Sequence, residues 1–209
     1  MNSGPTPIVF VVDDDQAMRN SLKWLIESIG MQVKTYGSAG EFLNSYYPGR
    51  VGCLLLDVRM PGMSGLDLLA HLAREDSWLP VIMITGHGDV AMAVKAMKSG
   101  AVDFIEKPFH DGDLLTSIRN ALEFEEKQRL LRSRRAEIAF RLSELTPREH
   151  EVMVMVTDGR ANKEIAAVLG VSAKTVEAHR ARVMDKMCAR SLAELVRMAL
   201  IAGDGVQPL

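Results

Sequence analysis

Polar side chains that suit phosphoryl chemistry follow short apolar runs in the first half of the chain. Asp13 and Asp14 follow the first run, Asp57 ends the third, Thr85 follows the fourth, and Lys107 comes after the fifth. If each run is a strand of a parallel sheet, all of these side chains leave its carboxyl edge, where open α/β folds bind ligands. The sequence therefore predicts one polar cluster built from distant segments.

Such a cluster has a defined chemistry because its carboxylates repel one another. Two carboxylates about 4 Å apart repel by roughly 4 kcal/mol at an effective dielectric near 20. A lysine offsets part of this repulsion, and Mg²⁺ offsets more while keeping positions for water or phosphate oxygens. A carboxylate nucleophile, a cation, a lysine and a hydroxyl together suit phosphoryl transfer. We interpret Asp57 as the nucleophile.

The elements that must position these residues alternate regularly along the chain. Apolar runs at 8–12, 53–57 and 80–84 are typical of buried strands, and two further strands are expected at 31–35 and 102–105. Helical spacing and capping residues predict helices at 16–29, 38–47, 64–74 and 90–98, with another from Asp111. The alternation predicts an α/β fold, a doubly wound five-stranded parallel sheet.

Each polar residue also has a structural interpretation. Asp57 alone could be a turn or helix cap, and Lys107 alone could be a solvated side chain. For Asp15 we favour helix capping. Because these polar groups occur together at the ends of several strands, a shared site is favoured over separate caps.

Composition limits the classes of protein that the chain can belong to. The 209 residues carry a net charge of −2, so no global field favours nucleic acid or a membrane surface, although residues 160–190 are locally basic. Two cysteines provide no disulfide framework. No apolar run reaches the length of a membrane span and the N-terminus does not resemble a signal peptide, so we expect a soluble, cytoplasmic protein.

Four motifs within residues 7–122 are VVDDD, LLLDVRMPGMSG, VIMITGHGD and AVDFIEKPF. With them, this part of the chain resembles the receiver domain of bacterial two-component response regulators, which has a flavodoxin-like fold, and the match to the FixJ subgroup is close. The resemblance implies that a sensor histidine kinase phosphorylates Asp57. It further implies that Mg²⁺ (or Mn²⁺) is held by Asp13, Asp14, Asp57 and the main-chain carbonyl of Arg59.

The same resemblance assigns supporting roles at the other strand ends. Lys107 would pair with the phosphoryl group and precede a cis peptide bond to Pro108. Thr85 would reorient toward the phosphoryl group, and Phe104 would swing inward as the switch aromatic. His87, with Arg59, would tune the rate of phosphate loss. The family pairs two receivers through a helix–strand face, which here consists of Val94, Lys95, Lys98, Asp103 and Glu106.

A charged segment connects the two halves of the chain. Phe124, Leu131, Ile138 and Leu145 recur every seven residues, but Gln128 and Arg135 occupy the alternate positions. Only half of a coiled-coil stripe is therefore present. We interpret residues 123–142 as a helical linker, and the sequence leaves open whether it is rigid or flexible.

The last third of the chain predicts a small all-α domain. Thr146-Pro147-Arg148-Glu149 is a capping box with proline at the first helical position. Asn162, Ser172 and Ser191 are expected to cap three further helices, with Glu194 completing a box at the last, where Leu195, Met198 and Leu200 should face inward. The short turn between the second and third of these helices is typical of a helix-turn-helix.

Residues 143–202 resemble the LuxR-type helix-turn-helix through LTPREHEVM, GRANKEIAAVLGVSAKTVEAHRARVMDKM and SLAELVRMA. By that match the residues expected to contact the DNA backbone are Lys163, Lys174, Thr175, His179 and Arg182. The residues expected to read bases are Glu177, Ala178 and Ala181. Packing against a neighbouring helix is the alternative role for His179.

The leading hypothesis is a response regulator with three parts: a receiver at 1–122, a linker at 123–142 and a DNA-binding domain at 143–209. Phosphorylation of Asp57 would convert a monomer into a homodimer that binds double-stranded promoter DNA, engages RNA polymerase and activates transcription, without membrane association. One alternative is an aspartyl phosphatase, although such enzymes place an acid two residues after the nucleophile and Arg59 occupies that position. The other is a constitutive DNA-binding protein with a vestigial receiver.

Overall fold

The computed structural model describes residues 5–75, 77–86 and 90–203. The chain divides into two compact units, Met1–Gln128 and Arg129–Leu209. The two units are described separately below. The boundaries predicted at 122 and 142 stay predictions.

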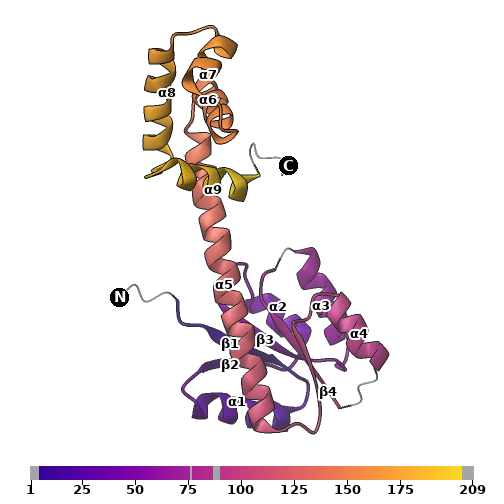
Figure 1. The fold of residues 1–209 in the computed structure, drawn as a ribbon. Coiled ribbons are helices and arrows are strands. Elements are labelled where there is room, and N and C mark those ends of the chain that lie inside the picture. Colours follow the sequence, from indigo (N-terminus) through magenta and orange to yellow (C-terminus); the bar gives the residue numbers. More distant parts are fainter. Residues whose placement is uncertain (1–4, 76, 87–89, 204–209) are drawn as a thin grey trace. The chain divides into compact units, whose positions relative to one another are not determined.

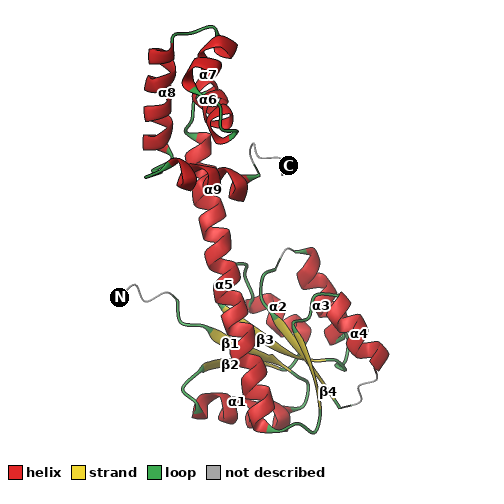
Figure 2. Ribbon diagram, in the orientation of Figure 1, coloured by secondary structure: helices red, strands yellow, loops and turns green. Residues whose placement is uncertain are grey.

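The first unit is built on a parallel sheet (Figures 1 and 2). Its strands are β1 Ile8–Val12, β2 Gln32–Tyr36, β3 Gly52–Asp57, β4 Val81–Thr85 and β5 Asp103–Glu106. The strand order is β2-β1-β3-β4-β5, and every neighbouring pair is parallel. The prediction of a doubly wound five-stranded parallel sheet is confirmed.

Helices cover both faces of this sheet (Figure 1). They are α1 Gln16–Ser28, α2 Ala39–Ser45, α3 Gly65–Arg74, α4 Val90–Lys98 and α5 Asp111–Ser143. Along β1, Phe10 packs in one core with α2 and α3, whereas Val9 and Val11 pack in the other with α1 and α5. Successive residues of a strand point to opposite faces, so each strand contributes to two cores.

Several element boundaries differ by one or two residues from the sequence-based expectation. Helix α2 ends at Ser45 and not at Tyr47, because Tyr46 is extended, its ring stacks on Phe42 and its hydroxyl bonds to Ser77 at 2.7 Å. Strands β2, β4 and β5 each begin one residue later than predicted, and β3 begins one residue earlier. The predicted Ser64–Asp67 capping box at α3 is confirmed.

Helix α5 continues through the segment expected to be a helical linker. Phe124 and Leu131 of the heptad pattern are about half exposed, whereas Ile138 is buried in the core of the second unit. The helix therefore contributes side chains to both units.

The second unit is helical (Figure 2). It contains the end of α5 with α6 Pro147–Thr157, α7 Asn162–Leu169, α8 Ala173–Lys186 and α9 Leu192–Ala202. Its core includes Val152, Met153, Ile165, Val176 and Val183. The predicted capping box of Thr146 and Glu149, with Pro147 at the helix start, is confirmed.

Three details predicted for this unit are wrong. Ala161, not Asn162, is the N-cap of α7, because Glu164 accepts the Ala161 N–H while the Asn162 side chain accepts from Arg180. Leu200 is 53% exposed, and Ala199 takes the buried position.

The third concerns Ser191, which caps α9 without a completed box. The Glu194 carboxylate accepts from the N–H of Arg190 instead.

Among the helices in the described part of the chain, none is long and apolar enough to cross a bilayer.

Candidate functional site

Asp57 lies at the end of the fully buried strand β3 and is only 7% exposed. Its Oδ1 atom accepts a hydrogen bond from Lys107 Nζ at 2.8 Å, and its Oδ2 atom accepts from the Arg59 N–H at 2.7 Å. Both carboxylate oxygens are thus held in defined directions. The strand and the turn after it aim this carboxylate at the carboxyl edge of the sheet.

Lys107 connects Asp57 to a second acid. Its Nζ atom also donates to Asp13 Oδ2 at 2.7 Å, so one ammonium bridges the carboxylate that follows β1 and the carboxylate that ends β3. The Lys107 N–H bonds to the Thr85 carbonyl at 2.7 Å, and the predicted cis bond to Pro108 is present. The expectation that Asp13, Asp57 and Lys107 come together is confirmed.

Burial and charge shift the pKa values of this cluster. Burial raises the pKa of the Asp57 carboxyl above its usual range, and this outweighs the lowering effect of the Lys107 ammonium. Burial also acts to lower the pKa of Lys107, but the hydrogen bonds and charges of Asp13 and Asp57 together outweigh it and raise that pKa. The lysine is therefore held charged between the two acids.

The three acids of the VVDDD motif have different environments. Asp13 is buried, and its Oδ1 atom accepts the N–H of Asp15 at 2.8 Å. Asp14 is exposed, whereas Asp15 caps α1 as predicted. In the described part of the chain, no three His, Cys, Asp or Glu side chains are grouped as a metal-holding set. Asp13 and Asp57 instead share Lys107.

Thr85 and Phe104 occupy the two strands on the other side of Asp57. Thr85 ends β4 and is 1% exposed, and it is in register with Glu106 of β5. Phe104 is half-buried and packs against the core shared with α2 and α3. Thr85 directly follows Ile84, the register partner of Asp57 on β4, whereas Phe104 pairs with Met83, one residue before Ile84. His87 lies outside the described residues.

Gly65 supports the site and was not singled out from the sequence. A Cβ atom on this residue would lie 2.1 Å from the main-chain oxygen of Asp57. The Gly65 N–H also bonds to the Val58 carbonyl at 3.0 Å. The start of α3 can approach the Asp57 main chain this closely only without a side chain. The motif MPGMSG contains the signal, but the partner of Gly65 is visible only in the fold.

The predicted dimer face is mostly exposed. Val94, Lys95 and Lys98 of α4 and Glu106 of β5 face solvent. Asp103 differs, because its carboxylate accepts hydrogen bonds from the Ser117 hydroxyl of α5 and from the Phe104 N–H.

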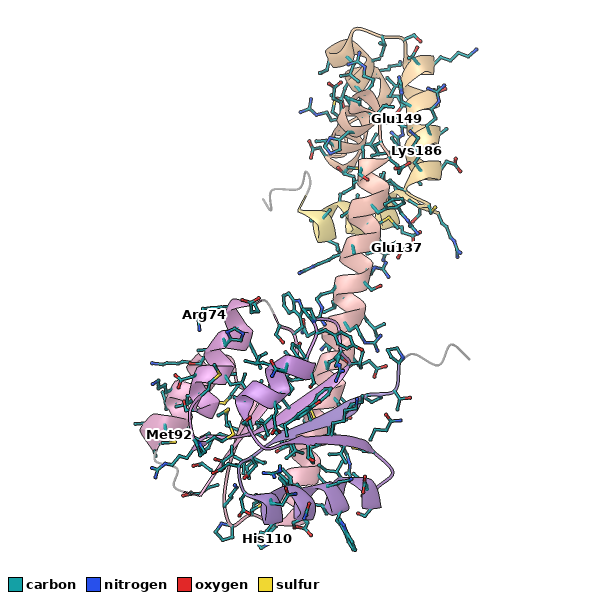
Figure 3. The ribbon with its side chains drawn as sticks, turned by 180° about the vertical axis from the view of Figure 1, so that it is seen from behind. Arg74, Met92, His110, Glu137, Glu149 and Lys186 are labelled. Atoms are coloured by element: carbon teal, nitrogen blue, oxygen red, sulfur yellow. The ribbon has the colours of Figure 1, made fainter. Side chains whose placement is uncertain are left out.

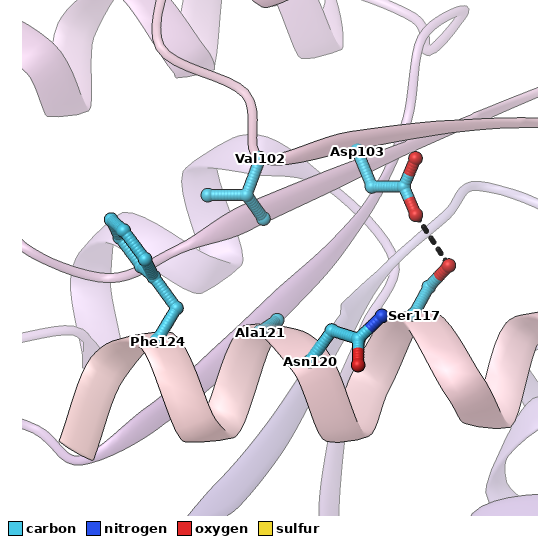
Figure 4. A pocket seen from close by; sticks show the side chains of 6 residues that line it. All are labelled: Val102, Asp103, Ser117, Asn120, Ala121 and Phe124. Atoms are coloured by element: carbon cyan, nitrogen blue, oxygen red, sulfur yellow. Dashed lines mark hydrogen bonds between the residues drawn. The ribbon is translucent and has the colours of Figure 1, made fainter. Parts of the chain in front are cut away.

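Asp103 also lines an open pocket between β5 and α5 (Figure 4). Its carboxylate is therefore bonded within the first unit, unlike the other side chains of the predicted dimer face.

The turn between α7 and α8 has helix-turn-helix geometry. Gly170 ends α7 in the left-handed region, with a φ of 65°, and Ser172 caps α8 by accepting the Thr175 N–H. Asn162 at the start of α7 accepts a 2.8 Å bond from Arg180 of α8, which joins the two helices. The predicted pair of helices and its short turn are confirmed.

Most of the predicted DNA contacts are exposed on this pair of helices. The exposed residues are Lys163, Lys174, Thr175, Glu177, Ala178, Ala181 and Arg182. His179 is half-buried, and its Nδ1 atom is buried without a hydrogen-bond partner in the described part of the chain. At least one edge of this ring therefore faces the protein interior.

An ion pair fixes α8 against α6. Glu149 is 3% exposed and accepts a 2.7 Å bond from Lys186, which also bonds to the Glu144 carbonyl. Glu149 and Lys186 are labelled in Figure 3. Hydrogen bonds from Lys186 and the Thr146 main chain lower the pKa of Glu149 to about 2. This pair holds one end of the exposed helix α8 in place.

Comparisons with known proteins match both units. Residues 9–119 match the response regulator receiver domain, and residues 143–199 match the bacterial regulatory proteins of the luxR family. Nodulation protein W of Bradyrhizobium diazoefficiens is 49% identical over 196 residues, covering 94% of this chain and 86% of that protein. The transcriptional regulatory protein FixJ of Azorhizobium caulinodans is 49% identical, covering 93% and 92%.

Among solved structures, the response regulator StyR is similar over 94% of this chain and 99% of its own, with 41% identity and a TM-score of 0.86. Full-length FixJ from B. japonicum is 44% identical with a TM-score of 0.59, covering 96% of this chain and 98% of its own.

Proposed function

The chain belongs to the response regulators that join a receiver domain to a LuxR-type DNA-binding domain, and we propose that Asp57 is its phosphoacceptor. The observation that carries the proposal is the Lys107 ammonium, which bonds to both Asp57 and Asp13 at the carboxyl edge of the sheet. In such regulators a sensor histidine kinase is the phosphodonor. Phosphorylation of the receiver then controls transcription through the DNA-binding domain.

The transfer that we propose is an in-line displacement. An Asp57 carboxylate oxygen attacks phosphorus, the new O–P bond forms, and the P–N bond to the kinase histidine breaks. The leaving imidazole takes a proton from water. Lys107 lies beside the attacking carboxylate and would balance the charge on the phosphoryl oxygens. The Arg59 N–H, which bonds to the other oxygen, would keep the carboxylate aimed along its strand.

The oxygen atoms at this edge fit a hard divalent cation. The Asp13 and Asp57 carboxylates share Lys107, and the Arg59 main chain follows directly, so three oxygen donors belong to neighbouring segments. We propose that these groups hold Mg²⁺ or Mn²⁺, with Asp14 as a further ligand after its exposed side chain turns inward. The ion would supply positive charge against the phosphoryl oxygens.

Thr85 and Phe104 are the residues that we propose respond to the phosphoryl group. The Thr85 hydroxyl would turn toward the phosphoryl oxygens, and the half-buried Phe104 ring would move into the space that this opens. Receiver switches of this kind shift an existing equilibrium between two conformations.

We propose that the face formed by Val94, Lys95, Lys98, Asp103 and Glu106 then pairs two copies. The lysines of α4 would then lie opposite the acids of β5 in the other copy across a two-fold axis.

Helix α8 is the element that we propose enters the DNA major groove. Glu177, Ala178 and Ala181 are exposed where base edges would lie, whereas Lys163, Lys174, Thr175 and Arg182 would contact phosphates. His179 would contact the backbone only through its exposed edge, since its Nδ1 atom is buried. The dimer would bind paired half-sites and activate transcription with RNA polymerase. Because its DNA target lies in the bacterial cytoplasm, the protein would act there.

Two other functions make different predictions. An aspartyl phosphatase would hydrolyse an external phosphoester, but Arg59 replaces the acid that such enzymes use two residues after the nucleophile. A constitutive DNA-binding protein would bind DNA equally with and without phosphorylation. We propose that the chain is not an enzyme acting on an external substrate.

Phosphoryl uptake from a small phosphodonor tests the assignment of Asp57. Wild type should give one phosphorylated species with Mg²⁺, and Asp57→Asn should give none. Asp15→Asn is the matched control, because asparagine caps a helix as well as aspartate and the change removes an acid from the same edge. Equal labelling of Asp57→Asn and wild type would reject the assignment.

A further inference from the structure

Arg19 of helix α1 reaches out of its helix to the end of the preceding strand. Its Nη1 atom donates to the main-chain oxygen of Asp13 at 2.6 Å. By contrast, Arg74 of α3 donates at 3.2 Å to Ala70, a carbonyl of its own helix. An arginine on the surface of a helix can be hydrated by solvent or can bond within its own helix, as Arg74 does, whereas Arg19 bonds the carbonyl of a loop residue next to buried acids. The contact therefore connects Arg19 to the polar cluster.

Every polar group of Asp13 has a partner, and Arg19 supplies one of them. The Asp13 N–H bonds to the Tyr36 carbonyl at 3.3 Å, which holds the residue against β2. Its Oδ1 atom accepts the Asp15 N–H, and its Oδ2 atom accepts from Lys107. Arg19 completes the set at the main-chain oxygen. The guanidinium thus fixes the peptide from which the Asp13 carboxylate projects.

The guanidinium is itself oriented by neighbouring side chains. Its Nη2 atom donates to the side-chain oxygen Oε1 of Gln16, and the Nε2 atom of Gln16 donates to Asn20 Oδ1 at 2.9 Å. A Cβ atom on Gly37 would lie 3.6 Å from the Arg19 guanidinium carbon, so the group also lies beside the loop after β2. A planar guanidinium held in this way needs little further ordering to make its bond.

From these contacts we propose that Arg19 is a positioning residue for the cation and phosphoryl site. It holds the Asp13 main chain so that the carboxylate stays directed at the carboxyl edge beside Asp57. The inference rests on the proposed function, because it takes the Asp13 and Asp57 oxygens as cation ligands. Groups that orient metal ligands typically change metal affinity about 10- to 100-fold when they are removed.

Binding of Mn²⁺ alone to the full-length protein tests this role without phosphorylation. Free Mn²⁺ is measured by electron paramagnetic resonance during titration of wild type, Arg19→Ala, Arg19→Lys and the control Arg74→Ala. We expect Arg19→Ala to weaken binding about tenfold. Arg19→Lys keeps a charged donor and should recover most of that loss. Arg74→Ala should match wild type, because its bond lies within α3.

Two further measurements separate positioning from loss of folding. The Asp15 amide should exchange faster with solvent in Arg19→Ala, because its acceptor on Asp13 is less well held. Gln16→Ala leaves the Arg19–Asp13 bond available and removes only its orienting partner, so it should weaken Mn²⁺ binding about threefold. The smaller effect should appear even if Arg19→Ala proves unstable.

The outcomes distinguish this inference from the function on which it rests. If wild type binds Mn²⁺ and Asp13→Asn does not, but Arg19→Ala and Gln16→Ala both bind like wild type, the positioning role is wrong and the proposed site stands. If wild type fails to bind Mn²⁺, or Asp13→Asn binds it equally well, both proposals are overturned. A tenfold loss in Arg19→Lys as well as Arg19→Ala would also contradict positioning by a charged donor.

Discussion

Replacing Lys107 by methionine removes the ammonium that bonds to both Asp13 and Asp57 while keeping a side chain of similar length. Without it, two carboxylates that now share one nitrogen at 2.7 and 2.8 Å face each other at the buried edge. Two oxygens on opposite sides of one nitrogen at these distances lie at most about 5.5 Å apart, and at that separation two carboxylates repel by about 3 kcal/mol at an effective dielectric near 20. In a chelator, Lys107→Met should therefore lower the unfolding free energy of the first unit by about 3 kcal/mol, or about 10 °C in Tm.

Tryptophan fluorescence measures this unit selectively within the full-length protein, because the two tryptophans, Trp24 and Trp78, both belong to it. Mg²⁺ should restore more stability to Lys107→Met than it adds to wild type, since the ion replaces the missing charge. Lys34→Met, which changes an exposed lysine on β2, is the control. An unchanged Tm in chelator, or an equal Mg²⁺ effect on wild type and variant, would refute the reasoning.

Three further predictions concern other parts of the molecule. The pKa of Glu149 is lowered, so its ionised carboxylate should contribute about 1–2 kcal/mol to the unfolding free energy of the second unit. This contribution should be complete above pH 4.5 and be lost as the pH falls through about 2. The unfolding free energies of wild type and Glu149→Gln, measured by urea unfolding, should therefore become more similar as the pH falls from 4.5 to about 2. A difference that stays constant would contradict the pairing with Lys186. Gly65→Ala should lower the unfolding free energy of the first unit by about 1–3 kcal/mol, measured by tryptophan fluorescence, because its Cβ would meet the Asp57 oxygen at 2.1 Å; an unchanged value would show that α3 shifts freely. Lys174→Ala should weaken binding to all DNA sequences alike and reduce the salt slope by about 1, whereas a loss confined to one sequence would indicate base recognition.

The sheet was predictable because each buried strand is a short apolar run that ends in a polar residue. Asp57 is the clearest case, since β3 is buried along its whole length and the chain turns directly after it. The order β2-β1-β3-β4-β5 is a different matter, because the length and apolarity of a run do not specify its neighbours. Capping residues such as Ser64 and Thr146 were equally predictable, since their partners lie three residues away.

Features that depend on distant partners were missed or predicted wrongly. Asn162 has the composition of an N-cap, but Arg180, eighteen residues later, takes its side chain. Leu200 has the helical spacing of an inward residue, yet the packing of α9 buries Ala199 instead. Arg19 belongs to no strand end, and its bond to the Asp13 main chain follows only from the way α1 leaves β1.

The direct test of the central claim is operator binding with and without beryllofluoride, an analogue of the phosphoryl group, in the presence of Mg²⁺. The DNA is a fragment that the beryllofluoride-treated protein selects from random sequence, and its affinity is measured by fluorescence anisotropy for wild type and Asp57→Asn. We predict that beryllofluoride tightens binding by wild type about tenfold or more and leaves Asp57→Asn unchanged. Equal affinity of wild type with and without beryllofluoride, or equal tightening of both proteins, would contradict a switch that operates through Asp57.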